Sequence, residues 1–210
     1  MRKKNLNRNF IYFIVFLFLV SCSSVPKYPQ NACKIFGEKY SYLKYSRAAS
    51  KKWNVPISSI LAVINKESGF KRFAKPKRTK LFKIIPYRRP SSSLGFSQAV
   101  NKTWDLYKKE NNKPLALRIS LKHSSDFIAW YFWKTNKINK VSLKDTRNMY
   151  LNYYLGWGAY KNKAYEKDRK AIIFAKKNDF VFFSSMYLIE ISCMAVARLC
   201  LIWPISSMSK

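Results

Sequence analysis

Hydrophobic residues in the middle of the chain recur every three or four positions, the spacing that places them on one face of an α-helix. This pattern predicts helices over residues 39–53, 56–68, 97–111, 124–136 and 143–155. Pro56 suits the first turn of the second helix, where its missing N–H costs little, and Gly69 suits the stop that follows it. No segment alternates apolar and polar residues over the length of a strand. We therefore predict an all-α fold.

The first residues have the pattern of an export signal. Four basic residues precede an uninterrupted apolar stretch over residues 10–20. That stretch is too short to cross a bilayer as a helix of about 20 residues. A cationic segment followed by a short apolar one is typical of a secretory signal peptide.

The residues that close this segment, Leu19-Val20-Ser21-Cys22, resemble the bacterial lipobox. The resemblance implies that cleavage leaves Cys22 as an acylated N-terminus, which would hold the chain at a membrane as a lipoprotein. Ser23 after the cysteine implies the outer membrane, with the domain facing the periplasm. The alternative is an ordinary signal peptide that happens to end in cysteine.

These boundaries divide the chain into four parts. The parts are a signal peptide at residues 1–21, a tether at 22–32, a helical domain at 33–179 and an apolar tail at 180–210. Glu190 and Arg198 interrupt the apolar tail, and placing such residues inside a membrane is costly. A buried terminal helix is therefore favoured over a membrane-spanning one, and both interpretations stay open.

The chain is strongly basic, with 41 Lys and Arg against 10 Asp and Glu, a formal charge of +31. Residues 71–89 hold nine basic residues and no acidic one. Such a charge attracts nucleic acid, an anionic membrane face or an anionic cell wall. The alternative is that the lysines form a solvated surface with no particular partner. The export signal argues against nucleic acid, as does the lack of an evident aromatic and basic stacking motif.

Three cysteines remain once Cys22 is lipidated: Cys33, Cys193 and Cys200. Outside the cytoplasm a disulfide can form. Pairing of Cys33 with either Cys193 or Cys200 would tie the start of the domain to its end. The chain has one histidine and no Cys-x-x-Cys, so we predict no metal site and no cofactor.

Glu67 has the best setting for acid–base chemistry of any acidic residue. It ends the second predicted helix, next to that helix's apolar face. Burial among apolar groups raises the pKa of a carboxyl, as a proton donor to a glycosidic oxygen requires. Glycosidases commonly use a second carboxylate. The best candidates, Asp105 and Asp126, are interpreted as helix or surface residues, so a mechanism with one carboxylate fits better.

Three elements of the sequence resemble those of the soluble lytic transglycosylase (SLT) type. Lys66-Glu67-Ser68-Gly69-Phe70 is similar to its Glu-Ser element, Gly95-Phe96-Ser97-Gln98 to its Gly-Leu-Met-Gln element, and Asn152-Tyr153-Tyr154-Leu155-Gly156 to its Ala-Tyr-Asn-Ala-Gly element. Further stretches resemble a subgroup of small lipoproteins with a divergent SLT domain. They are Arg89-Pro90-Ser91-Ser92, Thr103-Trp104, Asp126-Phe127, Trp130-Tyr131 and residues 153–158.

This resemblance implies a lysozyme-like, goose-type helical fold and a peptidoglycan lytic transglycosylase. Glu67 would be the single acid and base that cleaves the β-1,4 bond between N-acetylmuramic acid and N-acetylglucosamine, with a 1,6-anhydro product. Tyr153 would hydrogen-bond Glu67. The residues that would bind substrate are Ser68, Gly95, Phe96, Gln98 and Tyr153. The expected partners are peptidoglycan strands and, through Cys22, a membrane, and the protein is expected to be a monomer.

The third element departs from the family pattern, because Tyr154 stands where the family has asparagine. This departure leaves a second hypothesis open. In that hypothesis the chain is a non-catalytic lipoprotein that binds peptidoglycan with the same fold.

Overall fold

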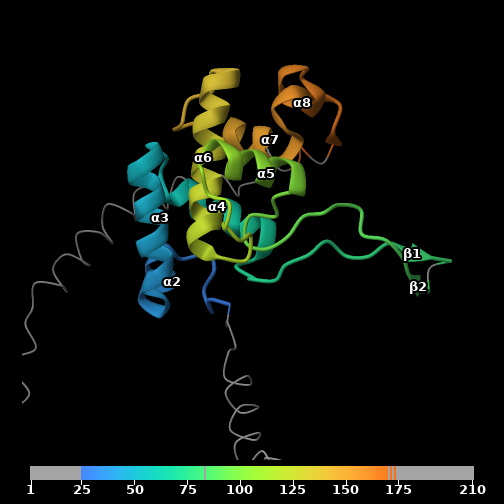
Figure 1. Cartoon of the computed structure of the whole chain (residues 1–210), viewed down its shortest axis with the longest axis horizontal. Coiled ribbons are helices and arrows are strands. Elements are labelled where there is room, and N and C mark those ends of the chain that lie inside the picture. Colours follow the sequence, from blue (N-terminus) through green and yellow to red (C-terminus); the bar gives the residue numbers. More distant parts are fainter. Residues whose placement is uncertain (1–24, 83, 170, 172, 174–210) are drawn as a thin grey trace, which may run out of the picture.

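The computed structural model describes residues 25–82, 84–169, 171 and 173. This part of the chain is mostly helical, which confirms the predicted fold class (Figure 1). Its helices are α2 (Ala32–Glu38), α3 (Tyr40–Trp53), α4 (Ile57–Ser68), α5 (Asn101–Glu110), α6 (Leu121–Asn139), α7 (Thr146–Leu155) and α8 (Trp157–Lys161), followed by the 3-10 turn η1 (Ala164–Glu166). The predicted signal peptide and apolar tail lie outside the described residues.

The five predicted helices correspond to α3 through α7, with differences at their ends. Helix α5 begins at Asn101 and not at residue 97. Gln98 has a left-handed backbone, with φ of 48°, and Ala99 forms a β-bridge with Leu94, so the chain cannot yet be helical there. Helix α7 begins at Thr146 because Asp145 caps it, its side chain accepting the backbone N–H of Asn148.

Helix α6 is the centre of the fold and contacts α3, α4, α5, α7 and α8 (Figure 1). It is buried on nearly all sides, as expected for a helix enclosed by others. Its aromatic residues fill the core, and the hydroxyl of Thr135 bonds both the helix itself and a neighbouring side chain. Thr135 Oγ1 donates to the carbonyl of Tyr131 at 2.8 Å and accepts from Trp157 Nε1 at 2.8 Å. Helix α6 also packs on α4 and α7, the two helices that carry the site, and its Tyr131 hydroxyl donates to the carbonyl of Asn152 on α7 at 3.0 Å.

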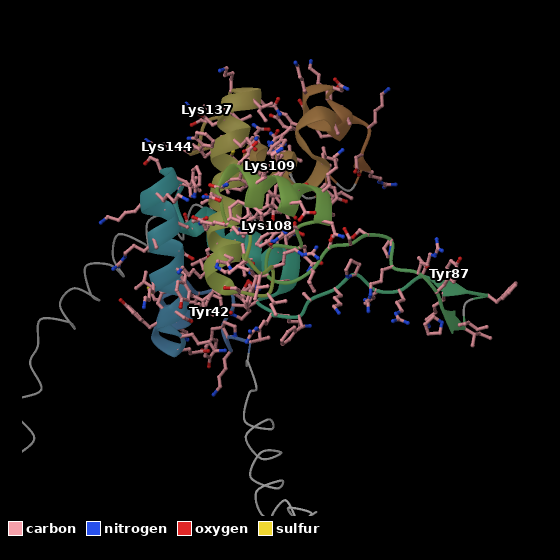
Figure 2. The ribbon with its side chains drawn as sticks, viewed as in Figure 1. Tyr42, Tyr87, Lys108, Lys109, Lys137 and Lys144 are labelled. Atoms are coloured by element: carbon pink, nitrogen blue, oxygen red, sulfur yellow. The ribbon has the colours of Figure 1, made fainter. Side chains whose placement is uncertain are left out.

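The basic segment 71–89 forms no helix, as its prolines predicted. It contains the antiparallel strands β1 (Lys80–Leu81) and β2 (Ile85–Pro86), and it extends away from the helical body (Figure 1). Lysines such as Lys109, Lys137 and Lys144 point outward from the body itself (Figure 2). Across the described residues, no helix combines the length and apolar character that crossing a membrane requires.

Cys33 lies on α2 and is disulfide-bonded. The chain's other cysteines lie outside the described residues, so the pairing with Cys193 or Cys200 stays a prediction.

Candidate active site

Glu67 is the second-last residue of α4, and the chain turns sharply after it. Gly69 adopts the left-handed conformation, with φ of 55°, and its N–H bonds the carbonyl of Asn65 at 2.8 Å. Phe70 is also left-handed and is buried, with its ring edge-on to Tyr42 at 5.2 Å between centroids. This turn ends the helix at the point where Glu67 reaches a cleft.

The Glu67 carboxyl is half-buried and receives one strong hydrogen bond. The Tyr150 hydroxyl of α7 donates to its Oε1 at 2.9 Å. Burial raises the pKa of Glu67, while the Tyr150 hydrogen bond and the positive charge of Lys66 oppose the rise without cancelling it. A carboxyl in this state holds its proton closer to neutral pH than an ordinary glutamate does. It can therefore act as a general acid.

The cleft beside Glu67 has a volume of about 440 Å³. It lies between the end of α4, the loop around residue 98, α6 and α7. Residues that line it include Glu67, Gln98, Phe127, Tyr131, Tyr153 and Tyr154. A cleft with aromatic walls and a few polar groups suits a sugar polymer. Another hollow of about 440 Å³ lies near Asn54 and Lys144, and none of the described residues that line it is acidic.

Gln98 is held so that its carbonyl oxygen is the group available for binding. Its Nε2 donates to the carbonyl of Ala74 at 2.9 Å and to that of Gly95 at 2.8 Å. Both amide hydrogens are thus used, and Oε1 is the acceptor that remains for a ligand in the cleft. Gln98 lines the same cleft as Glu67. Its role in binding substrate stays a prediction.

Gly95 is required by the path of the backbone. Its φ is +77°, and a Cβ there would lie 2.1 Å from the carbonyl oxygen of Arg118. The close approach holds the loop that carries Gln98 against the segment before α6. Gly95 therefore supports the cleft from behind, and a residue with any side chain would push the loop outward.

The prediction that Tyr153 hydrogen-bonds Glu67 is wrong. The Tyr153 hydroxyl donates to the carbonyl of Ser97 at 2.6 Å, and Tyr150 takes the place beside Glu67. The two tyrosines lie three residues apart on α7, so both face α4 and the cleft loop. Sequence resemblance pointed to Tyr153 alone, and only the packing of α7 shows which ring reaches the carboxyl.

Three other residues predicted to bind substrate lie behind the cleft. The Ser68 hydroxyl donates to the carbonyl of Ile64 at 2.8 Å and is buried. Phe96 is buried and edge-on to Tyr42, and Gly95 is buried beneath the loop. None of the three is among the described residues that line the cleft, so they support the site from behind, and substrate binding by them stays a prediction.

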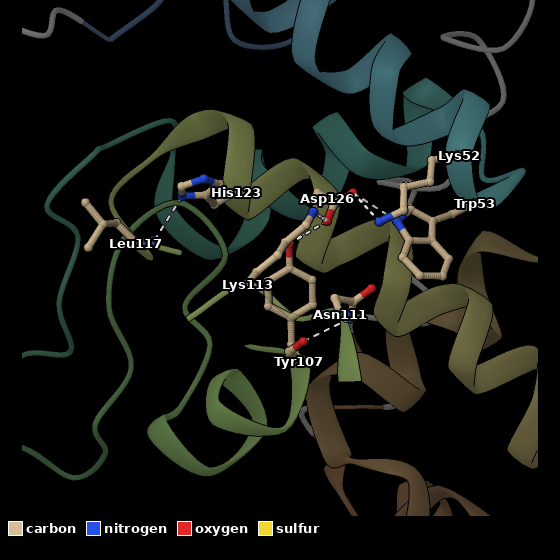
Figure 3. Close-up of polar contacts among 8 residues, drawn as sticks. All are labelled: Lys52, Trp53, Tyr107, Asn111, Lys113, Leu117, His123 and Asp126. Carbon is tan, nitrogen blue, oxygen red and sulfur yellow. Dashed lines mark hydrogen bonds and ion pairs between the residues drawn. The ribbon is translucent and has the colours of Figure 1, made fainter. Parts of the chain in front are cut away.

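The other candidate carboxylates are engaged elsewhere. Asp105 is exposed and pairs with Lys108 at 2.9 Å. Asp126, interpreted from the sequence as a helix or surface residue, lies in the second turn of α6 and is buried. Figure 3 shows Lys52, Trp53, Tyr107 and Lys113 grouped around it. Neither residue lines the cleft of Glu67.

Asp126 is held in its ionised form by these partners. Burial by itself raises its pKa, but hydrogen bonds from Lys113, Tyr107 and Trp53 outweigh burial and bring the pKa below its usual value. An ionised, fully bonded carboxylate is a poor acid and a poor nucleophile. Its arrangement connects α3, α5 and α6, which is a structural role.

We expect Asp126→Asn to lower the free energy of unfolding by about 2 kcal/mol at neutral pH, because Lys113 and Lys52 lose their counter-charge. The depressed pKa of Asp126 contributes stability above its unfolded pKa, and this contribution is lost as pH falls through the folded pKa. Urea titrations at several pH values should therefore show the difference between the two proteins shrinking below about pH 4. A difference that grows in acid would contradict this assignment.

Within the described ranges, no group of three or more acidic, histidine or cysteine residues could hold a metal ion. The absence of a metal and of a cofactor stays a prediction.

The fold and the cleft define a class of protein: a lysozyme-like helical domain with one protonatable carboxyl at the end of a buried helix. The chain matches the family model described as Transglycosylase SLT domain over residues 10–181, and it belongs to this family. No curated protein and no solved structure matches the chain. Members of the family are typically lytic transglycosylases, which suggests cleavage of peptidoglycan glycan strands.

Proposed function

We propose that the chain is a peptidoglycan lytic transglycosylase in which Glu67 is the single catalytic acid and base. The observation that carries this proposal is the state of the Glu67 carboxyl. It is half-buried, has a raised pKa, is oriented by Tyr150 and opens onto a cleft. In a chain of the SLT family, this is the group best placed to protonate a glycosidic oxygen.

The reaction needs one proton that leaves Glu67 and returns to it. Glu67 donates its proton to the oxygen between N-acetylmuramic acid and N-acetylglucosamine, and the bond from that oxygen to C1 of the muramoyl residue breaks. The carboxylate then takes the proton of the muramoyl C6 hydroxyl, whose oxygen attacks C1. The product is a 1,6-anhydro ring, and Glu67 is again protonated.

An intramolecular nucleophile explains why one carboxylate suffices. The C6 hydroxyl is already attached to the reacting sugar, so a high effective concentration replaces an activated water. Asp105 and Asp126, the alternatives for a second carboxylate, are both ion-paired outside the cleft. Gln98 Oε1, which faces the cleft, would accept a hydrogen bond from a substrate N–H.

Digestion of purified sacculi by the full-length chain tests the activity. We expect mass spectrometry to detect 1,6-anhydromuropeptides that accumulate with time. Muropeptides with reducing ends would show a hydrolase instead. No products from a folded protein would favour the non-catalytic hypothesis.

One observation favours the second hypothesis, in which the chain binds peptidoglycan without cleaving it. Tyr154 occupies the position of the family's asparagine, lines the cleft and stacks on Tyr150 at 6.4 Å. If this ring blocks productive binding, the protein would sediment with sacculi without cleaving them. Sedimentation that is unchanged in Glu67→Gln, together with no turnover, would support a binding lipoprotein.

Tyr150 would position Glu67 and tune its proton affinity. Because the Tyr150 hydrogen bond lowers the pKa of Glu67, we expect Tyr150→Phe to raise that pKa further. The alkaline limb of the rate–pH profile, which reports loss of the acid's proton, should move to higher pH. We also expect the maximal rate to fall by about tenfold, since the carboxyl is no longer oriented.

Tyr153→Phe is the matched control, because its hydroxyl bonds Ser97 and not Glu67. Its alkaline limb should stay where the wild-type limb lies. If Tyr153→Phe moves the limb and Tyr150→Phe does not, the assignment is reversed.

We also propose that the chain is a lipoprotein acylated at Cys22 and held at the outer membrane, facing the periplasm, as its lipobox suggests. In this proposal residues 1–21 are removed, 22–32 are the tether, 33–179 are the catalytic domain and 180–210 are an appended apolar segment. Within the family, the chain is proposed to belong to the subgroup of small lipoproteins with a divergent SLT domain. Mass spectrometry of the N-terminal peptide should find acyl chains that are lost in Cys22→Ser.

A further inference from the structure

The segment 71–90, which we call the basic arm, projects from the helical body and carries the antiparallel strands β1 and β2 (Figure 1). Thr79 and Arg88 pair at its stem, where the Thr79 N–H bonds the Arg88 carbonyl at 2.9 Å. The Tyr87 N–H bonds the Thr79 carbonyl at 2.7 Å, and Leu81 pairs with Ile85 in register. The tip is thus shaped by its own hydrogen bonds, away from the core.

The tip of the arm presents large apolar side chains to solvent. Phe82 is 82% exposed, Ile84 is 80% exposed and Ile85 is 56% exposed. Tyr87 is also exposed and lies on the same part of the arm (Figure 2). Clustered exposed apolar residues on a soluble domain mark a surface that contacts a membrane or a partner.

The stem of the arm is uniformly cationic. The segment contains no acidic residue. Its exposed basic side chains are Lys71, Arg72, Lys75, Lys77, Arg78, Lys80, Arg88 and Arg89. An apolar tip that continues into a cationic stem matches the layers of an anionic bilayer, with acyl chains inside and phosphate groups at the surface.

We propose that the basic arm docks on a bilayer that contains anionic phospholipids, with Phe82, Ile84 and Ile85 inserted among the acyl chains. The apolar tip favours an anionic bilayer over the other anionic partners, nucleic acid and the cell wall. Nucleic acid and the cell wall would satisfy the cations, but neither offers an apolar phase for two isoleucines. This contact is separate from the proposed lipid anchor at Cys22, and it does not depend on Glu67 being catalytic.

The base of the arm is joined to the loop that lines the cleft. The Ala74 carbonyl accepts both the Gly95 N–H and the Gln98 Nε2, each at 2.9 Å. The Arg89 side chain donates to the Pro76 carbonyl at 2.9 Å and ties the two sides of the stem together. A docked arm would therefore hold the cleft at a fixed orientation to the bilayer.

Hydrogen–deuterium exchange tests the docking with the full-length chain. The chain is reconstituted in vesicles of phosphatidylcholine alone and of phosphatidylcholine with phosphatidylglycerol. Both samples keep the N-terminal segment in a bilayer, so the comparison isolates the effect of lipid charge. We expect amides of residues 78–88 to exchange about tenfold more slowly in the anionic vesicles. Raising the salt concentration should reduce this protection.

Two sets of variants identify the contacts. The tip variant Phe82→Ser/Ile84→Ser/Ile85→Ser and the stem variant Lys77→Gln/Arg78→Gln/Lys80→Gln should each lose the protection. The matched controls, Leu115→Ser/Leu117→Ser and Lys102→Gln/Lys109→Gln/Lys144→Gln, change exposed residues of the body and should keep it.

Equal exchange in the two kinds of vesicle would overturn the proposal, and so would full protection in the tip variant. Protection produced by sacculus fragments or nucleic acid, and not by anionic vesicles, would assign the arm to those polymers instead. Glycan cleavage measured on the same samples is a separate result, so a failure of either proposal is recognised independently.

Discussion

Glu67→Gln is expected to lower the rate of glycan cleavage by about a thousandfold or more. The amide has the shape of the carboxyl and can still accept the hydrogen bond from Tyr150. It cannot donate a proton to the leaving oxygen, and it cannot take one from the C6 hydroxyl. The measurement is the rate at which 1,6-anhydromuropeptides appear from sacculi, compared with the wild-type protein.

Stability separates this catalytic role from a structural one. Since burial raises the pKa of Glu67, the ionised carboxyl destabilises the folded protein above its unfolded pKa. Stability is recovered as pH falls through the folded pKa. Glu67→Gln should therefore be at least as stable as the wild-type protein at neutral pH, and this advantage should shrink in acid. A marked loss of stability would mean that the missing activity reports damage to the fold.

Glu166→Gln is the matched control for the loss of a negative charge. Glu166 is an exposed acid on η1 that does not line the cleft. Its variant should keep wild-type activity. If both variants lose activity to the same degree, Glu67 has no special role.

The helices could be predicted because their signal is local. A period of three to four residues along α3 or α4 fixes which face is buried, and Gly69 marks the end of α4 within the same stretch. The position of Glu67 at a helix end beside a turn follows from this information. Its neighbour on α7 does not, because Tyr150 is 83 residues away in sequence.

The environment of Asp126 shows the same limit more strongly. From the sequence, an acid near a helix start is explained by the helix dipole. In the structure its partners come from α3, α5 and the segment after α5, and Trp53 is 73 residues distant. No local pattern encodes a convergence of that kind. It arises only once α3 and α5 have packed on α6.

The second large effect is expected at Gly95, where Gly95→Ala should lower the free energy of unfolding by about 3 kcal/mol. Two costs add at this position. A left-handed φ of +77° strains any residue with a Cβ, and that Cβ would lie 2.1 Å from the Arg118 carbonyl oxygen, far inside contact distance. The backbone around residue 95 must move, and it carries the carbonyl that holds Gln98. We therefore expect glycan binding to weaken as well.

Gly69→Ala separates the two costs, because Gly69 is also left-handed but its added Cβ would meet no atom within 4 Å. Gly69→Ala should lower the free energy of unfolding by about 1 kcal/mol, from backbone strain alone. Gly37→Ala, which has neither cost, should be neutral or slightly stabilising, since alanine favours the helix. Urea denaturation of the three variants gives the comparison. Equal losses of unfolding free energy in Gly95→Ala and Gly69→Ala would show that the Arg118 carbonyl moves aside at little cost. The close contact at Gly95 would then not be what holds the loop that carries Gln98.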